Sequence, residues 1–130
     1  MSSYEIPNEL AQFILDKIES VAQLEALLLC RQDPCVDWTT DAIAKRIYVS
    51  EEQARSALVR LHSEGLLGVK PGTPNRYHYN PSSEHIETLA NQLAETYAKQ
   101  LVPVTNLIHS KPRTKIQQFA DAFRLRKDEP

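Results

Sequence analysis

Apolar residues recur every three or four positions along much of this chain, which is the spacing of one face of a helix. The first such stretch covers residues 8–19, and Pro7 suits a helix start because proline lacks the backbone donor left unbonded there. A second helix is expected from Ser20, which forms a capping box with Gln23, and it should end ahead of Pro34. The two apolar stripes are Leu10, Phe13, Ile14 and Ile18, then Val21, Leu24, Leu27 and Leu28.

Two more helices are predicted in the middle of the chain. Thr39 and Thr40 are candidate N-caps for a third helix, and Ser50 forms a second capping box with Gln53 that opens a fourth. Gly65 is a typical helix stop and ends the fourth helix. The apolar faces of these helices are Ile43, Ala44 and Ile47, then Ala54, Leu58 and Leu61.

A β-hairpin is expected directly after the fourth helix. Leu66, Leu67 and Val69 indicate one strand, and the alternation around His78 indicates the returning strand. Residues 71–75 are rich in turn formers and predict a five-residue tip. A short extended piece at 35–38 precedes the third helix.

The last third of the chain predicts long helices. Over residues 83–109 the apolar positions follow an eleven-residue repeat, typical of a nearly straight helix seam, and Pro103 should kink this helix. The seam is too long for a small domain to bury, so we expect it to pack against a second copy of the chain. The alternative is a helix hairpin within one chain. The seam consists of Ile86, Ala90, Leu93, Tyr97, Leu101, Val104 and Ile108.

A break at Lys111-Pro112 separates a basic amphipathic helix over 112–126. Such a helix can dock on the dimer itself, on an acidic protein partner or on a membrane surface. Its modest apolar face lacks tryptophan, which argues against the membrane. The expected organisation is therefore a domain at 1–80 with an extra N-terminal helix, a dimerisation helix at 81–110, and a basic helix and tail at 111–130.

Charge and composition exclude several classes of protein. The 130 residues carry a net charge of −2, divided as −3 over residues 1–80, −2 over 81–110 and +3 over 111–130. Three glycines are too few for a glycine-rich phosphate loop. The N-terminus shows no signal-peptide pattern and there are only two cysteines, so we expect a cytoplasmic protein without disulfides.

The order of helix, short strand, helix, tight turn, helix and hairpin over residues 20–80 resembles a winged helix-turn-helix domain. Trp38-Thr39-Thr40 leads into the third helix, and Tyr48-Val49-Ser50 forms the turn. The spacing Ala54–Leu58–Leu61 followed by Gly65-Leu66-Leu67 is similar to bacterial regulators of the MarR and PadR kinds. The resemblance implies a mainly α fold with a small β-hairpin, a dimerising helix after the wing, and a transcription regulator that binds double-stranded DNA.

The candidate DNA contacts lie on three elements. On the fourth helix, Gln53 suits adenine, and Arg55 and Arg60 suit guanine or phosphate. Glu51 and Glu52 are explained better by the helix dipole than by cytosine contacts. The complete predicted set is Thr39 and Thr40 at a helix N-terminus, Ser50, Gln53, Arg55, Ser56 and Arg60 on the fourth helix, and Lys70, Asn75 and Arg76 on the wing.

An acidic recognition helix and a basic tail also fit a winged-helix module that binds another protein rather than DNA. No enzyme is expected, because nothing pairs a nucleophile or carboxylate with a base. No metal or other cofactor is expected, because the four histidines lie in different elements and the Cys30–Cys35 pair lacks a second pair. Cys30 is predicted to be a buried, inert thiol. An effector cleft lined by Phe13, Trp38 and Tyr97 is a further alternative to a plain core role for these aromatics.

Overall fold

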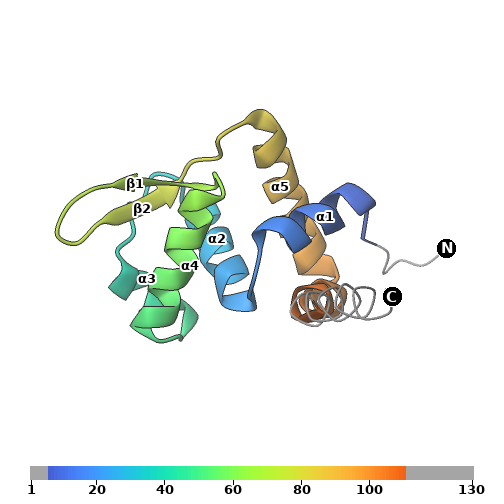
Figure 1. Ribbon diagram of the computed structural model, residues 1–130, viewed down its shortest axis with the longest axis horizontal. Helices are drawn as coiled ribbons and strands as arrows, with labels where there is room; N and C mark the ends of the chain where they lie inside the picture. The colour runs from blue at the N-terminus through green and yellow to red at the C-terminus, as the bar shows by residue number, and fades with distance from the viewer. Residues whose placement is uncertain (1–5, 111–130) are drawn as a thin grey trace, which may run out of the picture.

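The computed structural model describes residues 6–110. It is mainly helical with one two-stranded hairpin, as predicted. The elements in chain order are α1 (Asn8–Lys17), α2 (Val21–Gln32), α3 (Thr40–Ile47), α4 (Glu51–Ser63), β1 (Leu67–Lys70), β2 (Arg76–Tyr79) and α5 (Glu84–Lys99). Residues 101–110 form a further helical segment that reaches the end of the described chain. In Figure 1, α2, α3, α4 and the hairpin form one group, and α1 and α5 lie on the other side.

Short polar side chains determine where the helices begin. The hydroxyl groups of Ser20, Thr39, Ser50 and Ser83 each accept a hydrogen bond from the backbone N–H three residues later. Each such cap stabilises its helix by about 1 kcal/mol. At Ser50 the capping box is complete, because the Gln53 side chain also accepts from the Ser50 N–H at 3.1 Å. The predicted start of α4 is thereby confirmed.

The capping box predicted at Ser20 forms only in part. Gln23 accepts from the N–H of Glu19 at 2.9 Å instead of from that of Ser20, and its amide donates to the Lys17 carbonyl at 2.6 Å. Its side chain is buried, at 2% exposure. Gln23 therefore connects the end of α1 to the start of α2, a tertiary role that the local sequence pattern does not reveal.

The buried stripes of α2, α3 and α4 meet in a common core, and α2 and α3 both pack on α4. The positions predicted to be apolar inside α4, Ala54, Leu58 and Leu61, are fully buried. The largest side chains of this core are Leu24, Leu27, Ile43, Leu58, Leu61 and Leu66. The core holds α4 in place, so that its opposite face is free to meet a ligand.

Two residues with positive φ lie on either side of helix α4. Tyr48, in the turn after α3, has φ 61° and ψ 49°, and its side chain is 92% exposed. Gly65, just after α4, has φ 81°. Glycine adopts this conformation without a steric penalty, whereas tyrosine does not. The turn between α3 and α4 is therefore a strained point of the backbone.

The hairpin has the five-residue tip expected at 71–75, because Lys70 pairs with Arg76 at the ends of the antiparallel strands. The extended piece before α3 also joins it. Trp38 and Tyr77 exchange two backbone hydrogen bonds of 2.7 and 2.8 Å, so the base of the wing has a third, minimal strand. The wing is therefore attached to the residues that start α3.

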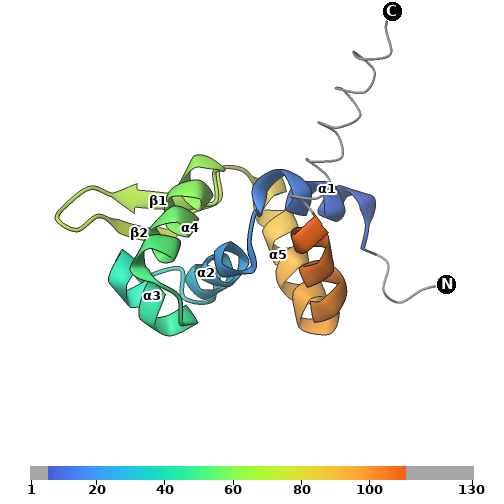
Figure 2. The same cartoon turned by 60° about the horizontal axis from the view of Figure 1, so that its bottom comes forward.

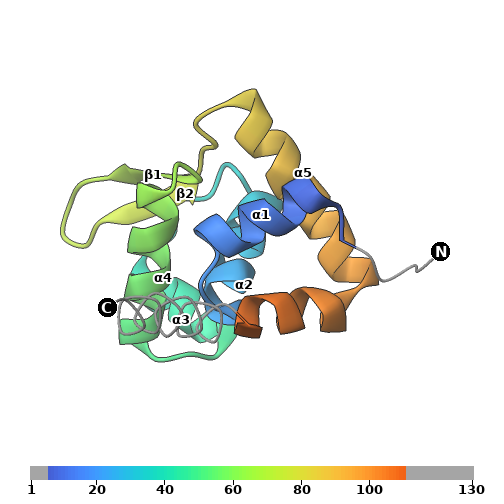
Figure 3. The ribbon, with the colours of Figure 1, turned by 45° about the vertical axis from the view of Figure 1, so that its right-hand side comes forward.

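The long helix predicted over 83–109 is broken rather than kinked, and the break lies three residues before Pro103, the residue predicted to interrupt it. The chain leaves α5 at Gln100, with φ −133° and ψ 58°. A proline at 103 cannot donate to the carbonyl of residue 99, and its ring would clash with that carbonyl. With the break at Gln100, Pro103 lies in the first turn of the next helix, where no N–H is needed. Figures 2 and 3 show the sharp change of direction after α5.

This break determines which residues of the apolar seam are buried within one chain. Ala90, Leu93, Val104 and Ile108 are buried within a single chain, whereas Leu101 is 53% exposed. Part of the seam is thus buried as in the alternative of a helix hairpin within one chain, because the turn at Gln100 directs its second half back onto the same chain. Packing between two copies through 83–109 remains a prediction. The basic helix predicted at 112–126 lies outside the described residues.

Candidate nucleic-acid interface

The exposed face of α4 follows from helix geometry. Successive residues are rotated by about 100°, so the side opposite the buried stripe carries the positions spaced four, three and four apart. We call these residues the outer stripe: Glu52, Ser56, Val59 and Ser63, all of them exposed. The outer stripe contains no cation. Basic side chains can therefore act only from the two flanks of the helix.

One flank of α4 faces the wing. Between them lies an open hollow of about 490 Å³ that brings the start of α3, the side of α4 and the tip of the wing together. We call it the wing-side hollow. Its lining residues are Thr39, Thr40, Asp41, Glu51, Arg55, Val59, Pro74, Asn75 and Tyr77. Four of the predicted DNA contacts thus share one surface, although they are as far apart in sequence as Thr39 and Asn75.

Arg55 provides the positive charge of this hollow. It is exposed, and within residues 6–110 neither Arg55 nor Arg76 of the wing has an ion-pair partner. Of the two carboxylates lining the hollow, Asp41 pairs with Lys45 at 3.1 Å. The unbonded N–H groups at the start of α3 add a partial positive charge. The hollow therefore offers a free guanidinium next to a helix N-terminus.

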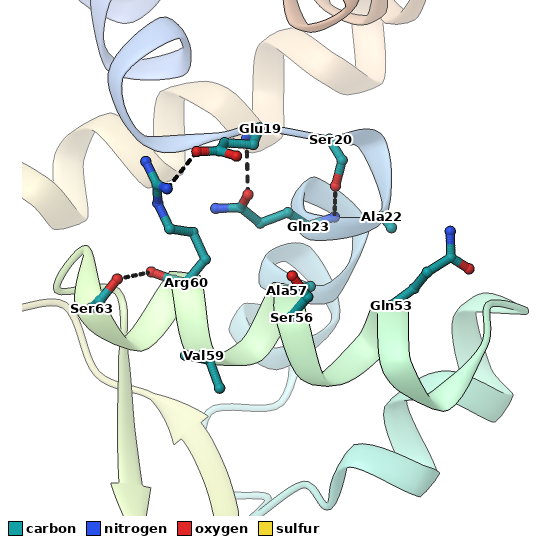
Figure 4. Close-up of a pocket in the computed structure, with 10 residues that line it drawn as sticks. All are labelled: Glu19, Ser20, Ala22, Gln23, Gln53, Ser56, Ala57, Val59, Arg60 and Ser63. Carbon is teal, nitrogen blue, oxygen red and sulfur yellow. Dashed lines mark hydrogen bonds and ion pairs between the residues drawn. The ribbon is translucent and has the colours of Figure 1, made fainter. Parts of the chain in front are cut away.

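Arg60 lies on the other flank of α4, because five residues of helix rotate it about 140° from Arg55. It forms ion pairs with Glu19 and, at 2.8 Å, with Glu64. Lys17 also reaches Glu64, at 3.2 Å. Figure 4 shows the Arg60 side chain directed toward Glu19 at the start of α2. The structure thus gives Arg60 a tertiary role between α4 and the α1–α2 junction, and separates it from Arg55.

A second hollow, of about 530 Å³, lies on this flank between α4 and the start of α2. Gln53 and Ser56, two further predicted contacts, line it, and Figure 4 shows their positions along α4. The Gln53 oxygen already accepts from Ser50, so only its NH₂ group is free to donate to a ligand. Val59 lines both hollows.

The predicted wing residues differ in their freedom. Lys70 is exposed but pairs with Asp37 at 3.0 Å. The Asn75 oxygen accepts from the Gly72 N–H at 2.9 Å and so holds the shape of the tip. Arg76 is exposed and unpaired among the described residues. Arg76 is therefore the wing cation most available to a phosphate.

Sequence reasoning missed two residues of this face. Val59 was not among the predicted contacts, although the 52–56–59–63 spacing identifies it as a member of the outer stripe. The guanidinium carbon Cζ of Arg46 lies 5.5 Å from the centre of the Trp38 ring, which places the Arg46 charge beside the base of the wing. No sequence pattern predicts that contact, because the two side chains meet only after α3 has formed.

Other candidate chemistry finds no site in the described part of the chain. No group of three or more His, Cys, Asp or Glu side chains suited to a metal ion occurs there. Cys30 is buried, and burial raises the pKa of its thiol to about 12, whereas Cys35 is exposed. No helix among these residues is long and apolar enough to cross a membrane. The exposed polar face around α4 is thus the main candidate site.

The helix-turn-helix of α3 and α4, the supporting helix α2 and the β1–β2 wing define a winged helix-turn-helix fold. Comparison of the sequence with protein-family profiles and with curated proteins finds no match. Solved structures do match. BpsR of Bordetella bronchiseptica, whose DNA binding is regulated by 6-hydroxynicotinic acid, is 15% identical over 93% of this chain and 84% of its own, with a TM-score of 0.53.

Two further structures support the same fold. A cysteine-to-serine mutant of MarR from E. coli is 17% identical, covering 94% of this chain and 86% of its own, with a TM-score of 0.51. The homodimeric winged helix-turn-helix DNA-binding domain of Mb0332 from Mycobacterium bovis is 20% identical, covering 78% and 94%, with a TM-score of 0.50. The predicted winged-helix fold and its likeness to MarR-type regulators are confirmed.

Proposed function

We propose that this protein is a transcription regulator that binds double-stranded DNA as a homodimer, with α4 in the major groove. The observation that carries the proposal is the wing-side hollow. It combines a free guanidinium on α4, the N-terminus of α3 and the wing tip on one exposed surface. Helix N-termini bind phosphate, and arginine makes the commonest specific contact to guanine.

Every predicted residue except Arg60 has a role in this proposal. Thr39 and Thr40 present the start of α3 to one phosphate, and Arg76 with Lys70 and Asn75 brings the wing to the neighbouring backbone. Gln53 and Ser56 face the base edges, and Ser50 holds the start of α4. The DNA contact predicted for Arg60 is not part of this proposal, because two carboxylates already occupy its guanidinium.

Two copies are needed for useful affinity. Residues 1–80 carry a net charge of −3, so each copy neutralises few phosphates. A dimer doubles the contacts and reads two half-sites about one helical turn apart. We place the dimer contact in the region 81–110, where Leu101 and Val102 leave apolar surface exposed, and the DNA-binding unit in residues 1–80. The homodimeric state of Mb0332 supports a dimer.

The first test is selection from a pool of genomic DNA fragments at about 50 and 200 mM salt, with sequencing of the bound fraction. The expected result is enrichment of a few fragments that share an inverted repeat, with weaker binding at the higher salt. Binding without any shared sequence would contradict a specific regulator. Absence of binding at both salt concentrations would contradict DNA binding altogether.

A charge-matched pair of variants then tests the site. Arg55→Ala should weaken binding to the selected duplex by roughly tenfold per subunit, because one guanidinium contact is lost. Arg31→Ala removes the same charge from the end of α2, where Arg31 donates to Asn91 at 2.9 Å and lines neither hollow beside α4, and should change binding less than twofold. Equal effects of the two variants would show that only overall charge matters. Thermal melting of both variants checks that the fold is intact.

A second candidate function is a winged-helix module that binds a basic protein surface instead of DNA. It is favoured by Glu51 and Glu52, which are exposed at the start of α4. A surface potential that is negative across both recognition helices of the dimer would support it, and a continuous positive stripe would support DNA. Failure of all DNA selection would leave this function as the one to pursue.

A further inference from the structure

The outer stripe of α4 contains one apolar residue among three polar ones. Val59 is 51% exposed, although a valine on a solvent-facing helix position contributes neither core packing nor high helix propensity. It stands between the two hollows and lines both of them. In Figure 4 its side chain points away from Arg60 and from the start of α2. An exposed methyl pair thus occupies the middle of the surface proposed to enter the major groove.

We propose that Val59 is a specificity residue that reads the 5-methyl group of a thymine in each half-site. This inference rests on the proposed function. Thymine is the only standard base that presents a methyl group in the major groove, and apolar side chains contact that methyl group. A stripe without cations cannot select guanine by bidentate hydrogen bonds, so apolar contact is the discrimination that its centre can provide.

The neighbours of Val59 support close approach of a base. Ser56 and Ser63, one turn to either side along the outer stripe, are small and exposed, so the stripe itself carries no long side chain next to the valine. Valine is also rigid, because one χ1 rotamer dominates in helices. Its two methyl groups are therefore fixed in place before binding, which limits the entropy lost on contact.

A protein partner fits this position less well. Protein hot spots are buried clusters rich in tryptophan, tyrosine or arginine, surrounded by residues that exclude water. Around Val59 the outer stripe offers a carboxylate and two hydroxyl groups instead. A single valine in polar surroundings suits one methyl group better than an apolar protein surface.

The test uses the full-length protein and the duplex obtained from the selection experiment. Thymines are replaced by deoxyuridine one at a time, which removes only the 5-methyl group. For the wild-type protein, one position in each half-site should weaken binding about fourfold, the effect of one buried methyl group. In Val59→Ala this position should become insensitive to the replacement, while the other positions keep their wild-type response.

Two further variants complete the design. Val59→Thr retains one methyl group and the branched side chain, so it should keep part of the thymine preference. Val36→Ala changes a valine that is 40% exposed in the loop before α3, and should leave the uracil profile unchanged. If Val59→Ala shows the same profile as the wild type, the inference is wrong while DNA binding stands. If no duplex is selected at all, the proposed function fails and this inference fails with it.

Discussion

Replacing Tyr48 with glycine should make the protein more stable than replacing it with alanine. Tyr48 has φ 61°, in the left-handed region that costs an L-residue about 1–2 kcal/mol. Its side chain is 92% exposed, so truncating it forfeits only about 0.5 kcal/mol of apolar burial. Both variants lose the same side-chain burial, and the difference between them isolates the backbone conformation.

The size of the difference follows from two opposing effects. Glycine removes the steric cost at positive φ, but it loses about 0.5–1 kcal/mol more conformational entropy on folding than alanine. The net advantage of Tyr48→Gly over Tyr48→Ala is therefore about 0.5–1 kcal/mol. Tyr48→Asn should fall between them, because asparagine tolerates the left-handed region better than alanine.

Urea denaturation measures this difference directly, with the fluorescence of the buried Trp38 as the signal. With a slope of roughly 1–2 kcal/mol/M, the midpoints of the glycine and alanine variants should differ by about 0.5 M, glycine being higher. A midpoint for alanine equal to or above that of glycine would refute the reasoning, because it would mean that the turn carries no left-handed strain in solution.

Three predictions concern buried groups. Gln23→Met should lower the free energy of unfolding in urea by about 2–4 kcal/mol, because two backbone groups at the α1–α2 junction lose their partners. The control Gln12→Met, on the exposed face of α1, should change it by no more than about 0.5 kcal/mol. An equally small loss for both variants would show that the junction is open to water. At pH 8 a thiol reagent should modify Cys35 quickly and Cys30 only on unfolding, and rapid reaction of both would contradict the burial of Cys30. Because burial raises the pKa of Cys30 to about 12, its folded thiol stays protonated above pH 9 while the unfolded one ionises, so stability should fall as the pH rises from 9, and less so in Cys30→Ala.

The local parts of the fold could be predicted from the sequence because the signals are local. Ser20, Thr39 and Ser50 act on N–H groups three residues away, and the tip of the hairpin is encoded in five consecutive residues. The break at Gln100 could not be placed in the same way. Pro103 prevents an unbroken helix through the preceding turn, but it does not fix which residue of that turn leaves the helix. That choice depends on what the second half of the seam packs against.

The candidate site also has a part that the sequence predicts and a part that depends on tertiary packing. The grouping of Thr39, Arg55 and Asn75 follows from a fold that the sequence resembles. The partners of Arg60 do not, because Glu19 lies 41 positions earlier in the chain and meets Arg60 only after α2 has packed on α4. Charge alone marked Arg55 and Arg60 as equals, and three-dimensional packing leaves only Arg55 free.

The backbone pairing of Trp38 with Tyr77 has a mechanical consequence. The wing is joined by two short hydrogen bonds to the residue just before Thr39, the N-cap of α3. These two bonds hold the base of the wing at a fixed distance from the start of α3. The distance between them is set by the backbone and not by side-chain rotamers, so in the proposed complex the duplex would adjust its groove width to the protein.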